Sequence, residues 1–248
     1  MEFPTYGEVF DAIYDIEEIY LSFIEQYLSK NGLNLELGCG AGRILLPMAK
    51  RGYRMIGLDR SKEMLDKLKA KAEELHIEQK IQLIQSDFIH LDSHGVYDTV
   101  YFSTDTFSMV ESVVERFEIV KMISSRLAKG GTLIIPLNNP VSYLGTPCQW
   151  FNHQGTIPKK GMIRIIEERK IHPERCMRDG HKWEIFSPEN QTYGIVQEQK
   201  RALSIITRNE IKILFRENRI RLKEEYGYFD KSPLTTDSTK SIFIGEKE

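Results

Sequence analysis

The stretch Glu36-Leu37-Gly38-Cys39-Gly40-Ala41-Gly42 decides the fold of this 248-residue chain. It follows an apolar run at residues 33–37 and precedes a helical pattern over residues 43–51, so we predict a turn between a first strand and a helix. Glycine at three of these positions lets bare backbone approach a ligand, and free amides in such a turn point outward. The stretch therefore predicts a cofactor-binding turn, with a tight turn that binds nothing as the alternative.

Short apolar runs and helical patterns alternate after this turn. Strand-like runs lie at residues 33–37, 54–58, 81–85, 99–102 and 132–137, and helical patterns lie at 43–51, 62–75 and 113–127. Gly52 is placed to end the first helix, Ser61 to cap the second, and Lys129-Gly130-Gly131 to close the third. Alternation of this kind predicts right-handed βαβ units and a mostly parallel α/β sheet.

The two ends of the chain and a middle segment have a different texture. Residues 1–32 carry apolar positions at helical spacing up to Lys30-Asn31-Gly32, and residues 149–206 predict a small inserted antiparallel β-meander. Thr207 and Glu210 form a capping box for a helix up to Asn218, and strand-like runs follow at 222–229 and 241–245. We expect a single domain over 1–248, with lid helices at 1–32, a core at 33–148 and 207–248, and the insertion over the acceptor site.

Composition excludes several classes of partner. The 34 basic and 36 acidic residues give a net charge of -2, without the basic excess typical of nucleic-acid binding. No apolar run approaches the roughly 20 residues of a membrane-spanning helix, and the first residues do not resemble a signal peptide. The three cysteines show no C-x-x-C spacing, so we expect no metal site and a cytoplasmic monomer or homodimer.

The spacing of the glycines distinguishes between cofactors. A dinucleotide fingerprint, G-x-G-x-x-G, would place its third glycine at position 43, where this chain has Arg43. The observed series of Glu36 followed by G-x-G-x-G instead resembles motif I of the S-adenosylmethionine-dependent methyltransferases with a Rossmann-like fold. The resemblance implies that this loop backs the methionine and ribose part of the cofactor, and that Glu36 helps to hold the methionine amino group.

Acidic residues also follow the second and third predicted strands. Asp59 is placed to accept both ribose hydroxyls, although an ordinary acid at a helix start is the alternative. Asp87 resembles the position at which the family receives the adenine amine, with Phe88 beside the ring, and a solvated turn acid is its alternative. The expected contacts of S-adenosylmethionine, and of its product S-adenosylhomocysteine, are Tyr14, Glu36, Gly38, Cys39, Gly40, Gly42, Asp59, Arg60, Asp87, Phe88 and Ser103.

The resemblance also implies a seven-stranded, mostly parallel sheet with an antiparallel final strand. The fourth strand lacks the [DN]-P-P-[YF] box found where many family members bind a planar amine, which argues against a DNA base as the acceptor. The inserted meander resembles that of the small-molecule branch, where such a sheet covers the acceptor pocket. The candidate acceptor contacts, for which packing or surface roles are alternatives, are Tyr6, Asn138, Tyr143, Trp150, His153 and Trp183.

These features predict an enzyme that moves a methyl group from S-adenosylmethionine to a small-molecule nitrogen or oxygen by in-line displacement. A neutral amine needs little beyond deprotonation, whereas an alcohol needs a general base, so the sequence identifies no catalytic residue. Three alternatives remain open: a peptide or protein acceptor, an NAD(P)-dependent oxidoreductase, and a module that binds the cofactor without catalysis.

Overall fold

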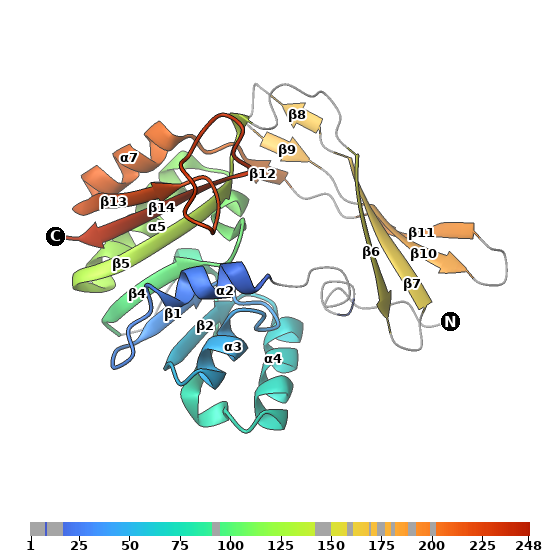
Figure 1. Cartoon of the computed structure of the whole chain (residues 1–248), viewed down its shortest axis with the longest axis horizontal. Coiled ribbons are helices and arrows are strands. Elements are labelled where there is room, and N and C mark those ends of the chain that lie inside the picture. Colours follow the sequence, from blue (N-terminus) through green and yellow to red (C-terminus); the bar gives the residue numbers. More distant parts are fainter. Residues whose placement is uncertain are drawn as a thin grey trace. The chain divides into compact units, whose positions relative to one another are not determined.

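The computed structural model describes residues 8, 17–90, 95–141, 150–157, 161–168, 170–172, 177–179, 182–187, 192–198 and 202–248. The chain divides into two compact units (Figure 1). One consists of Ile16–Ser142 with Ile206–Glu248, and the other of Tyr143–Ile205 with Met1–Asp15.

The larger unit is built on a seven-stranded sheet in the order β13-β14-β5-β4-β1-β2-β3. Neighbouring strands among β1 to β5 are parallel, whereas β14 is antiparallel to both β5 and β13. The predicted Rossmann-like sheet with an antiparallel final strand is confirmed. Its strands are β1 (Asn34–Leu37), β2 (Met55–Asp59), β3 (Ile81–Gln85), β4 (Tyr97–Phe102), β5 (Leu127–Asn138), β13 (Ile220–Tyr226) and β14 (Lys240–Lys247).

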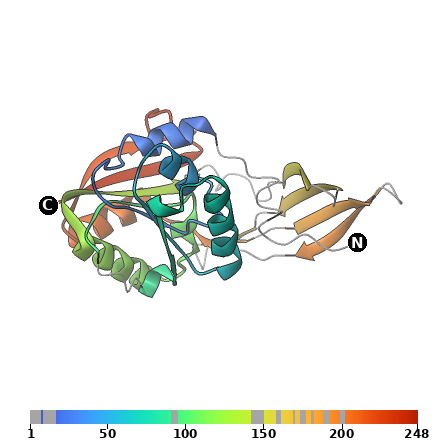
Figure 2. The same cartoon turned by 90° about the horizontal axis from the view of Figure 1, so that it is seen from below.

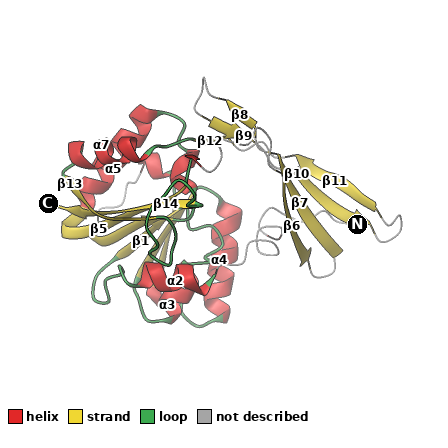
Figure 3. Cartoon of the chain, turned by 45° about the horizontal axis from the view of Figure 1, so that its top comes forward, coloured by secondary structure: helices red, strands yellow, loops and turns green. Residues whose placement is uncertain are grey.

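Helices cover both faces of this sheet, as expected for parallel strands that are buried on both sides (Figure 3). The first face carries α2 (Glu18–Glu25), α3 (Leu45–Lys50) and α4 (Lys62–Glu74). The second carries α5 (Val113–Arg126) and α7 (Arg208–Glu217). Figure 2, with α2 in blue and α5 in green, shows these two helices on opposite sides. Short 3-10 turns lie at Glu78–Lys80, Phe88–His90 and Thr106–Met109.

Helix ends follow the local signals where a few neighbouring residues suffice. Gly52 has φ +101°, its amide donates to the carbonyl of Ala49, and the next amide, of Tyr53, donates to that of Met48. This pattern is a Schellman motif. The Ser61 hydroxyl caps α4, and the Thr207 hydroxyl caps α7 by accepting a bond from the amide of Glu210.

Two predicted helix ends were wrong. The third helix ends at Arg126, because Leu127 is already extended and pairs with Tyr97 on β4, so the Lys129-Gly130-Gly131 stretch lies inside β5. The first helix that the structure describes, α2, ends at Glu25 and not near Lys30. There, the side chain of Asn34 bonds the amide and the carbonyl of Ser29 and shapes the turn that leads into β1.

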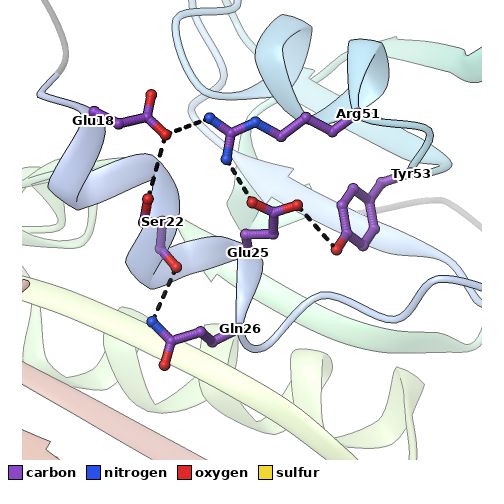
Figure 4. A network of polar contacts seen from close by, with 6 residues as sticks. All are labelled: Glu18, Ser22, Glu25, Gln26, Arg51 and Tyr53. Carbon is purple, nitrogen blue, oxygen red and sulfur yellow. Dashed lines mark hydrogen bonds and ion pairs between the residues drawn. The ribbon is translucent and has the colours of Figure 1, made fainter.

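Ion pairs attach α2 to α3 (Figure 4). The guanidinium of Arg51, at the end of α3, donates to Glu18 and to Glu25 of α2, at 2.5 Å each. The Tyr53 hydroxyl also donates to Glu25, at 3.3 Å. The pairs are partly exposed, so the buried residues of α2, such as Phe23, supply most of the packing energy. Together these contacts hold α2 against the first face of the sheet.

The smaller unit is antiparallel throughout its described strands. One sheet has the order β11-β10-β7-β6 and the other β12-β9-β8, so the insertion contains two sheets and not the single meander that the sequence predicted. In the sequence, β8 and β9 lie between β7 and β10, which are neighbours in the four-stranded sheet. The bounds are β6 (Trp150–Ile157), β7 (Gly161–Glu168), β8 (Lys170–His172), β9 (Met177–Asp179), β10 (Lys182–Ser187), β11 (Thr192–Glu198) and β12 (Ala202–Ser204).

Candidate functional site

The strand order of the large sheet reverses at β1, which lies between β2 and β4. In open α/β sheets, ligands bind at the carboxyl ends of the strands beside such a reversal. The turn at residues 38–42 follows β1, Asp59 ends β2, and Ser103 follows β4. The tertiary structure therefore gathers the acids and glycines of the sequence analysis at this edge.

The first three amides of the glycine turn are occupied within the protein. Gly38 and Cys39 both donate to the carbonyl of Leu58, at 2.8 and 3.1 Å. Gly40 donates to Oδ2 of Asp59 at 2.8 Å. The expectation that these amides point outward was wrong for all three residues, because the end of β2 supplies their acceptors. An anionic phosphate would have to displace these bonds, so the turn is suited to a ligand without one.

The glycines of the turn are required by backbone geometry and by close packing. Gly38 and Gly42 have φ values of +75° and +85°, which other residues rarely adopt. A Cβ on Gly42 would lie 2.8 Å from Leu68 and 2.9 Å from Leu46, and one on Gly38 would lie 2.5 Å from Thr106. The turn is therefore packed against α3, α4 and the segment after β4.

The side chain of Cys39 faces the core. It is 4% exposed, and a Cβ added to Gly57 on β2 would lie 2.8 Å from its sulfur. Burial raises the pKa of the thiol well above its ordinary value, with smaller effects in the same direction from Glu36 and Asp59. Cys39 belongs to the turn through its backbone, and its thiol is a packing group.

Asp59 connects two loops. Its Oδ2 accepts the Gly40 amide and its Oδ1 accepts the Ser61 amide, each at 2.8 Å. Both bonds place the side chain at the start of α4, in agreement with the alternative interpretation. Each carboxylate oxygen can accept a further bond, so a ribose contact stays a prediction. The neighbouring Arg60 is exposed.

The end of β3 contributes Asp87 and Phe88. Oδ1 of Asp87 accepts the amide of Ile89 at 3.2 Å, within the first turn after the strand. The ring of Phe88 meets that of Phe102 on β4 edge to face, with centroids 6.1 Å apart. Both residues are half-buried, and their predicted contacts with adenine remain predictions.

Glu36 is the most unusual acid of the site. It is 1% exposed, and Oε2 accepts a bond from the hydroxyl of Tyr101 on β4 at 2.9 Å. Its other oxygen, Oε1, is buried and makes no hydrogen bond within the described part of the chain. A buried carboxylate oxygen without a donor is costly, so this atom is placed to receive a donor from a ligand.

Burial governs the ionisation of Glu36. Removal of the carboxyl from water raises its pKa to about 8, although the nearby Tyr101 and Ser103 hydroxyls and the Arg43 guanidinium lower it. The charge of Asp59 raises it further. Burial therefore favours the protonated form of this carboxyl.

Tyr20 on α2 was not among the predicted site residues. Its hydroxyl accepts the amide of Thr104 at 3.1 Å, and its ring lies 4.0 Å from that of Phe229. Thr104 follows β4 and has φ +41°, a strained conformation for a β-branched residue. Helical spacing alone marks Tyr20 as a core residue, so no sequence signal distinguishes this role. Tyr101 lies in an apolar strand, and no sequence signal distinguishes its bond to Glu36 either.

Asn138, a predicted acceptor contact, is held at the end of β5. Its backbone amide donates to Oδ1 of Asp105 at 2.9 Å, and its side-chain amide contacts the same carboxylate. Its Oδ1 accepts a bond from Lys240 on β14 at 2.7 Å. The side chain therefore bridges two charged residues, and its contact with an acceptor stays a prediction.

For the other predicted site residues, the structure does not describe the side chains. Tyr6, Tyr14 and Tyr143 lie outside the described residues. For Trp150 and His153 on β6, and Trp183 on β10, the structure describes the strand but not the side chain. Among the described residues there is no group of three His, Cys, Asp or Glu suited to a metal ion, and no helix has the length and apolar character to cross a membrane.

The fold and the turn after β1 define a Rossmann-like α/β protein whose ligand loop is built without a phosphate cradle at Gly38, Cys39 and Gly40. Residues 35–131 match the family model described as "Methyltransferase domain". This stretch contains the glycine turn, Asp59 and Asp87, so the similarity to methyltransferase domains covers the predicted cofactor site.

Curated relatives match about half of the chain. A cypemycin N-terminal methyltransferase from Streptomyces sp is 27% identical over 109 residues, which are 44% of this chain and 43% of that protein. The chain spans about half the length of the curated relatives that it matches.

Solved structures resemble nearly the whole chain. The CcbJ methyltransferase from Streptomyces caelestis has a TM-score of 0.80 at 19% identity, over 99% of this chain and 93% of that one. CalS10 from Micromonospora echinaspora, an amino pentose methyltransferase with S-adenosylmethionine bound, has a TM-score of 0.74 at 16% identity, over 100% and 98%. At these identities the likeness establishes the fold.

Proposed function

We propose that this protein transfers a methyl group from S-adenosylmethionine to a nitrogen or oxygen atom of a small molecule. When bound, the cofactor supplies an electrophilic sulfonium methyl group, which the acceptor's lone pair takes in line as S-adenosylhomocysteine leaves. The protein then has to orient both molecules and exclude water.

The observation that carries this proposal is the buried Oε1 of Glu36. It makes no hydrogen bond within the described part of the chain, and it lies at the carboxyl end of β1 beside the glycine turn. The ammonium of the cofactor's methionine part supplies the missing donor and a matching positive charge. We assign the ribose hydroxyls to Asp59, and the adenine amine and ring to Asp87 and Phe88.

The same turn argues against a dinucleotide. The amides of Gly38, Cys39 and Gly40 are bonded to the end of β2, so they do not form a pyrophosphate cradle. Arg43 occupies the place of the third dinucleotide glycine. Both features support S-adenosylmethionine over NAD(P), and therefore methyl transfer over hydride transfer.

For the acceptor, a small molecule is the first candidate and a peptide the second. The amino pentose methyltransferase shares the fold over the whole of this chain, which supports a small molecule. The cypemycin N-terminal methyltransferase keeps a peptide or protein acceptor in consideration. We place the acceptor near Asn138, at the end of β5. A role of residues 149–206 over the acceptor stays a prediction from the sequence.

Calorimetry with S-adenosylhomocysteine tests the cofactor. We expect binding at submillimolar concentration and none with NADH or NADPH. Asp59→Ala is expected to weaken binding by about tenfold or more, because it removes a bidentate acceptor and the support of Gly40. The matched control is Asp66→Ala, an exposed acid of α4 paired with Lys62, which is expected to bind as the parent does.

A second assay tests the acceptor. Transfer of label from methyl-labelled S-adenosylmethionine is compared between a panel of amino and hydroxy metabolites and a panel of peptides with free N-termini. Label in the metabolites alone supports the proposal, and label in the peptides alone overturns its acceptor class. Binding of NADPH without S-adenosylhomocysteine would overturn the proposal as a whole.

A further inference from the structure

Glu36 lies in a row across the sheet in which the positions on β2, β4, β5 and β14 are uncharged, and the next charged residue of the row is Glu224 on β13. The strand register places it between Gly57 on β2 and Tyr101 on β4, and the row continues through Ile134 on β5 to Ile244 on β14. Tyr101, Ile134 and Ile244 are all 0% exposed and belong to the core cluster under α2 and α3. A carboxyl in such a row is ionised at a high cost unless a cation accompanies it.

The polar groups around this carboxyl come from several elements. Tyr101 donates to Oε2 at 2.9 Å, and this bond stabilises the ionised form. Burial outweighs this bond, the smaller contribution of the Ser103 hydroxyl after β4 and the attraction of Arg43, so the pKa of Glu36 stands at about 8. The titratable and charged groups that influence Glu36 or are influenced by it are Tyr101 of β4, Arg43 before α3, Asp59 of β2, Cys39 of the glycine turn and Tyr20 of α2.

From this arrangement we infer that Glu36 holds a proton in the free protein at neutral pH and releases it to solvent when the cofactor's ammonium binds, with Tyr101 as the positioning residue that holds Oε2. The proton of the free form lies on Oε1, because Oε2 already accepts the Tyr101 hydroxyl. An ammonium N–H takes the place of this proton at Oε1. The inference rests on the proposed function, since it requires the cofactor to bind here.

Proton release makes cofactor affinity depend on pH. Between about pH 6 and the pKa of Glu36, the dissociation constant falls about tenfold for each pH unit, and above that pKa it levels off. Tyr101→Phe removes a donor to the ionised carboxylate, so cofactor affinity falls at neutral pH. The pH above which the affinity becomes constant moves upward for the same reason. Glu36→Gln binds more weakly, and its affinity does not change with pH in this range.

The experiment is isothermal titration of the full chain with S-adenosylhomocysteine, which carries the same ammonium. Titrations at about pH 7 in phosphate and in Tris buffer give the number of protons released from the difference in heat. We expect about one proton per ligand in the parent and none in Glu36→Gln. In Tyr101→Phe we expect about one proton and a higher pH at which affinity levels off.

Tyr53→Phe is the matched control. Tyr53 is 4% exposed and donates to a glutamate, Glu25, but this pair lies between the end of α3 and α2 and not beside the turn (Figure 4). Its proton release and pH profile are expected to match the parent. Thermal unfolding of each variant establishes that it is folded, and Glu36→Gln tests the inference even if Tyr101→Phe does not fold.

Several outcomes would overturn the inference. Equal heats in the two buffers for the parent would show that Glu36 is already ionised, and proton release from Glu36→Gln would assign the proton to another group. An unchanged pH profile in Tyr101→Phe would remove the role of Tyr101. Absence of any binding by the parent would instead refute the proposed function, so the two failures are distinguishable.

Discussion

Oδ2 of Asp59, at the end of β2, accepts a hydrogen bond from the amide of Gly40, in the turn after β1, at 2.8 Å. The other carboxylate oxygen, Oδ1, accepts the amide of Ser61 at the start of α4. One side chain therefore closes the glycine turn and fixes the helix that follows β2. The shape of this turn, which is the proposed cofactor loop, therefore depends on a residue 19 positions further along the chain.

Asp59→Ala is predicted to destabilise the protein even without cofactor. Two bonds from backbone amides to a carboxylate are lost, which lowers the free energy of unfolding by about 2 to 4 kcal/mol. Urea denaturation at about pH 7 measures the loss. Asp66→Ala, at an exposed ion pair, is expected to change stability by less than about 1 kcal/mol, and equal losses in both variants would contradict the prediction.

Glu36→Gln is predicted to change how the stability of the free protein depends on pH. Glu36 stays protonated in the folded chain up to a pKa of about 8, whereas it ionises near its ordinary value of 4.5 in the unfolded chain. Between these values the unfolded state binds fewer protons, so this residue makes stability fall as pH rises. The substituted amide is uncharged in both states, so the variant does not show this loss.

The measurement is the difference in free energy of unfolding between Glu36→Gln and the parent. Relative to the parent, the variant is expected to become more stable by about 1 kcal/mol for each pH unit between pH 4.5 and about pH 8. Above about pH 8 the difference is expected to stay constant. Comparison with the parent removes the contributions of other titrating groups. A difference that is the same at about pH 5 and pH 8 would show that burial does not hold the proton on Glu36.

Gly42→Ala is predicted to cost more than Gly130→Ala. Both glycines have positive φ values, +85° and +75°, so either substitution strains the backbone by about 1 kcal/mol. Only at Gly42 does the new methyl group meet buried side chains, those of Leu68 and Leu46, within 3 Å. Overpacking adds about 1 to 3 kcal/mol, which chemical denaturation of both variants resolves. Equal losses would mean that α3 and α4 yield to the methyl group.

Arg116→Met is predicted to be strongly destabilising. Arg116 on α5 is 3% exposed, and its Nε donates to Oε1 of Glu210 on α7 at 2.6 Å. Its Nη1 also donates to the carbonyls of Val110 and Glu111. The substitution removes the cation that pairs with Glu210. We expect the free energy of unfolding to fall by about 3 to 5 kcal/mol, which chemical denaturation measures.

The control for Arg116→Met is Arg221→Met. Arg221 pairs with Glu246 at 2.5 Å, but the arginine side chain is 60% exposed. An exposed pair contributes at most about 1 kcal/mol and weakens with salt. If the two variants lost the same stability, the Arg116 pair would not be acting as a buried one.

Local signals determined much of the fold from sequence. The Ser61 and Thr207 caps and the Gly52 motif involve partners within about five residues, so propensity and spacing sufficed to predict them. The end of α5 was mistaken because Leu127 is taken into β5 by pairing with Tyr97, a partner thirty positions earlier. Pairing over such a separation has no signature in a short window.

The candidate site also has features that the sequence predicted and features that only the structure revealed. The series of Glu36 and the three glycines was sufficient to predict the cofactor, because it resembles motif I of the methyltransferases and lacks the third glycine of a dinucleotide fingerprint. The sequence did not reveal that three amides of the turn are already bonded, nor that Cys39 faces the core. Both facts depend on how β2 packs beside the turn.

By itself, the sequence determined the alternation of strands and helices, the glycine turn and the acid that precedes it. Only the tertiary structure determined the environment of that acid, Glu36. Parallel pairing of β1 with β4 brings the Tyr101 hydroxyl to Glu36 across 65 residues, and the packing of α2 and α3 over this row removes the carboxyl from water. Strand register and burial are cooperative, long-range properties, and they change an ordinary glutamate into a buried carboxyl with one oxygen that has no donor among the described residues.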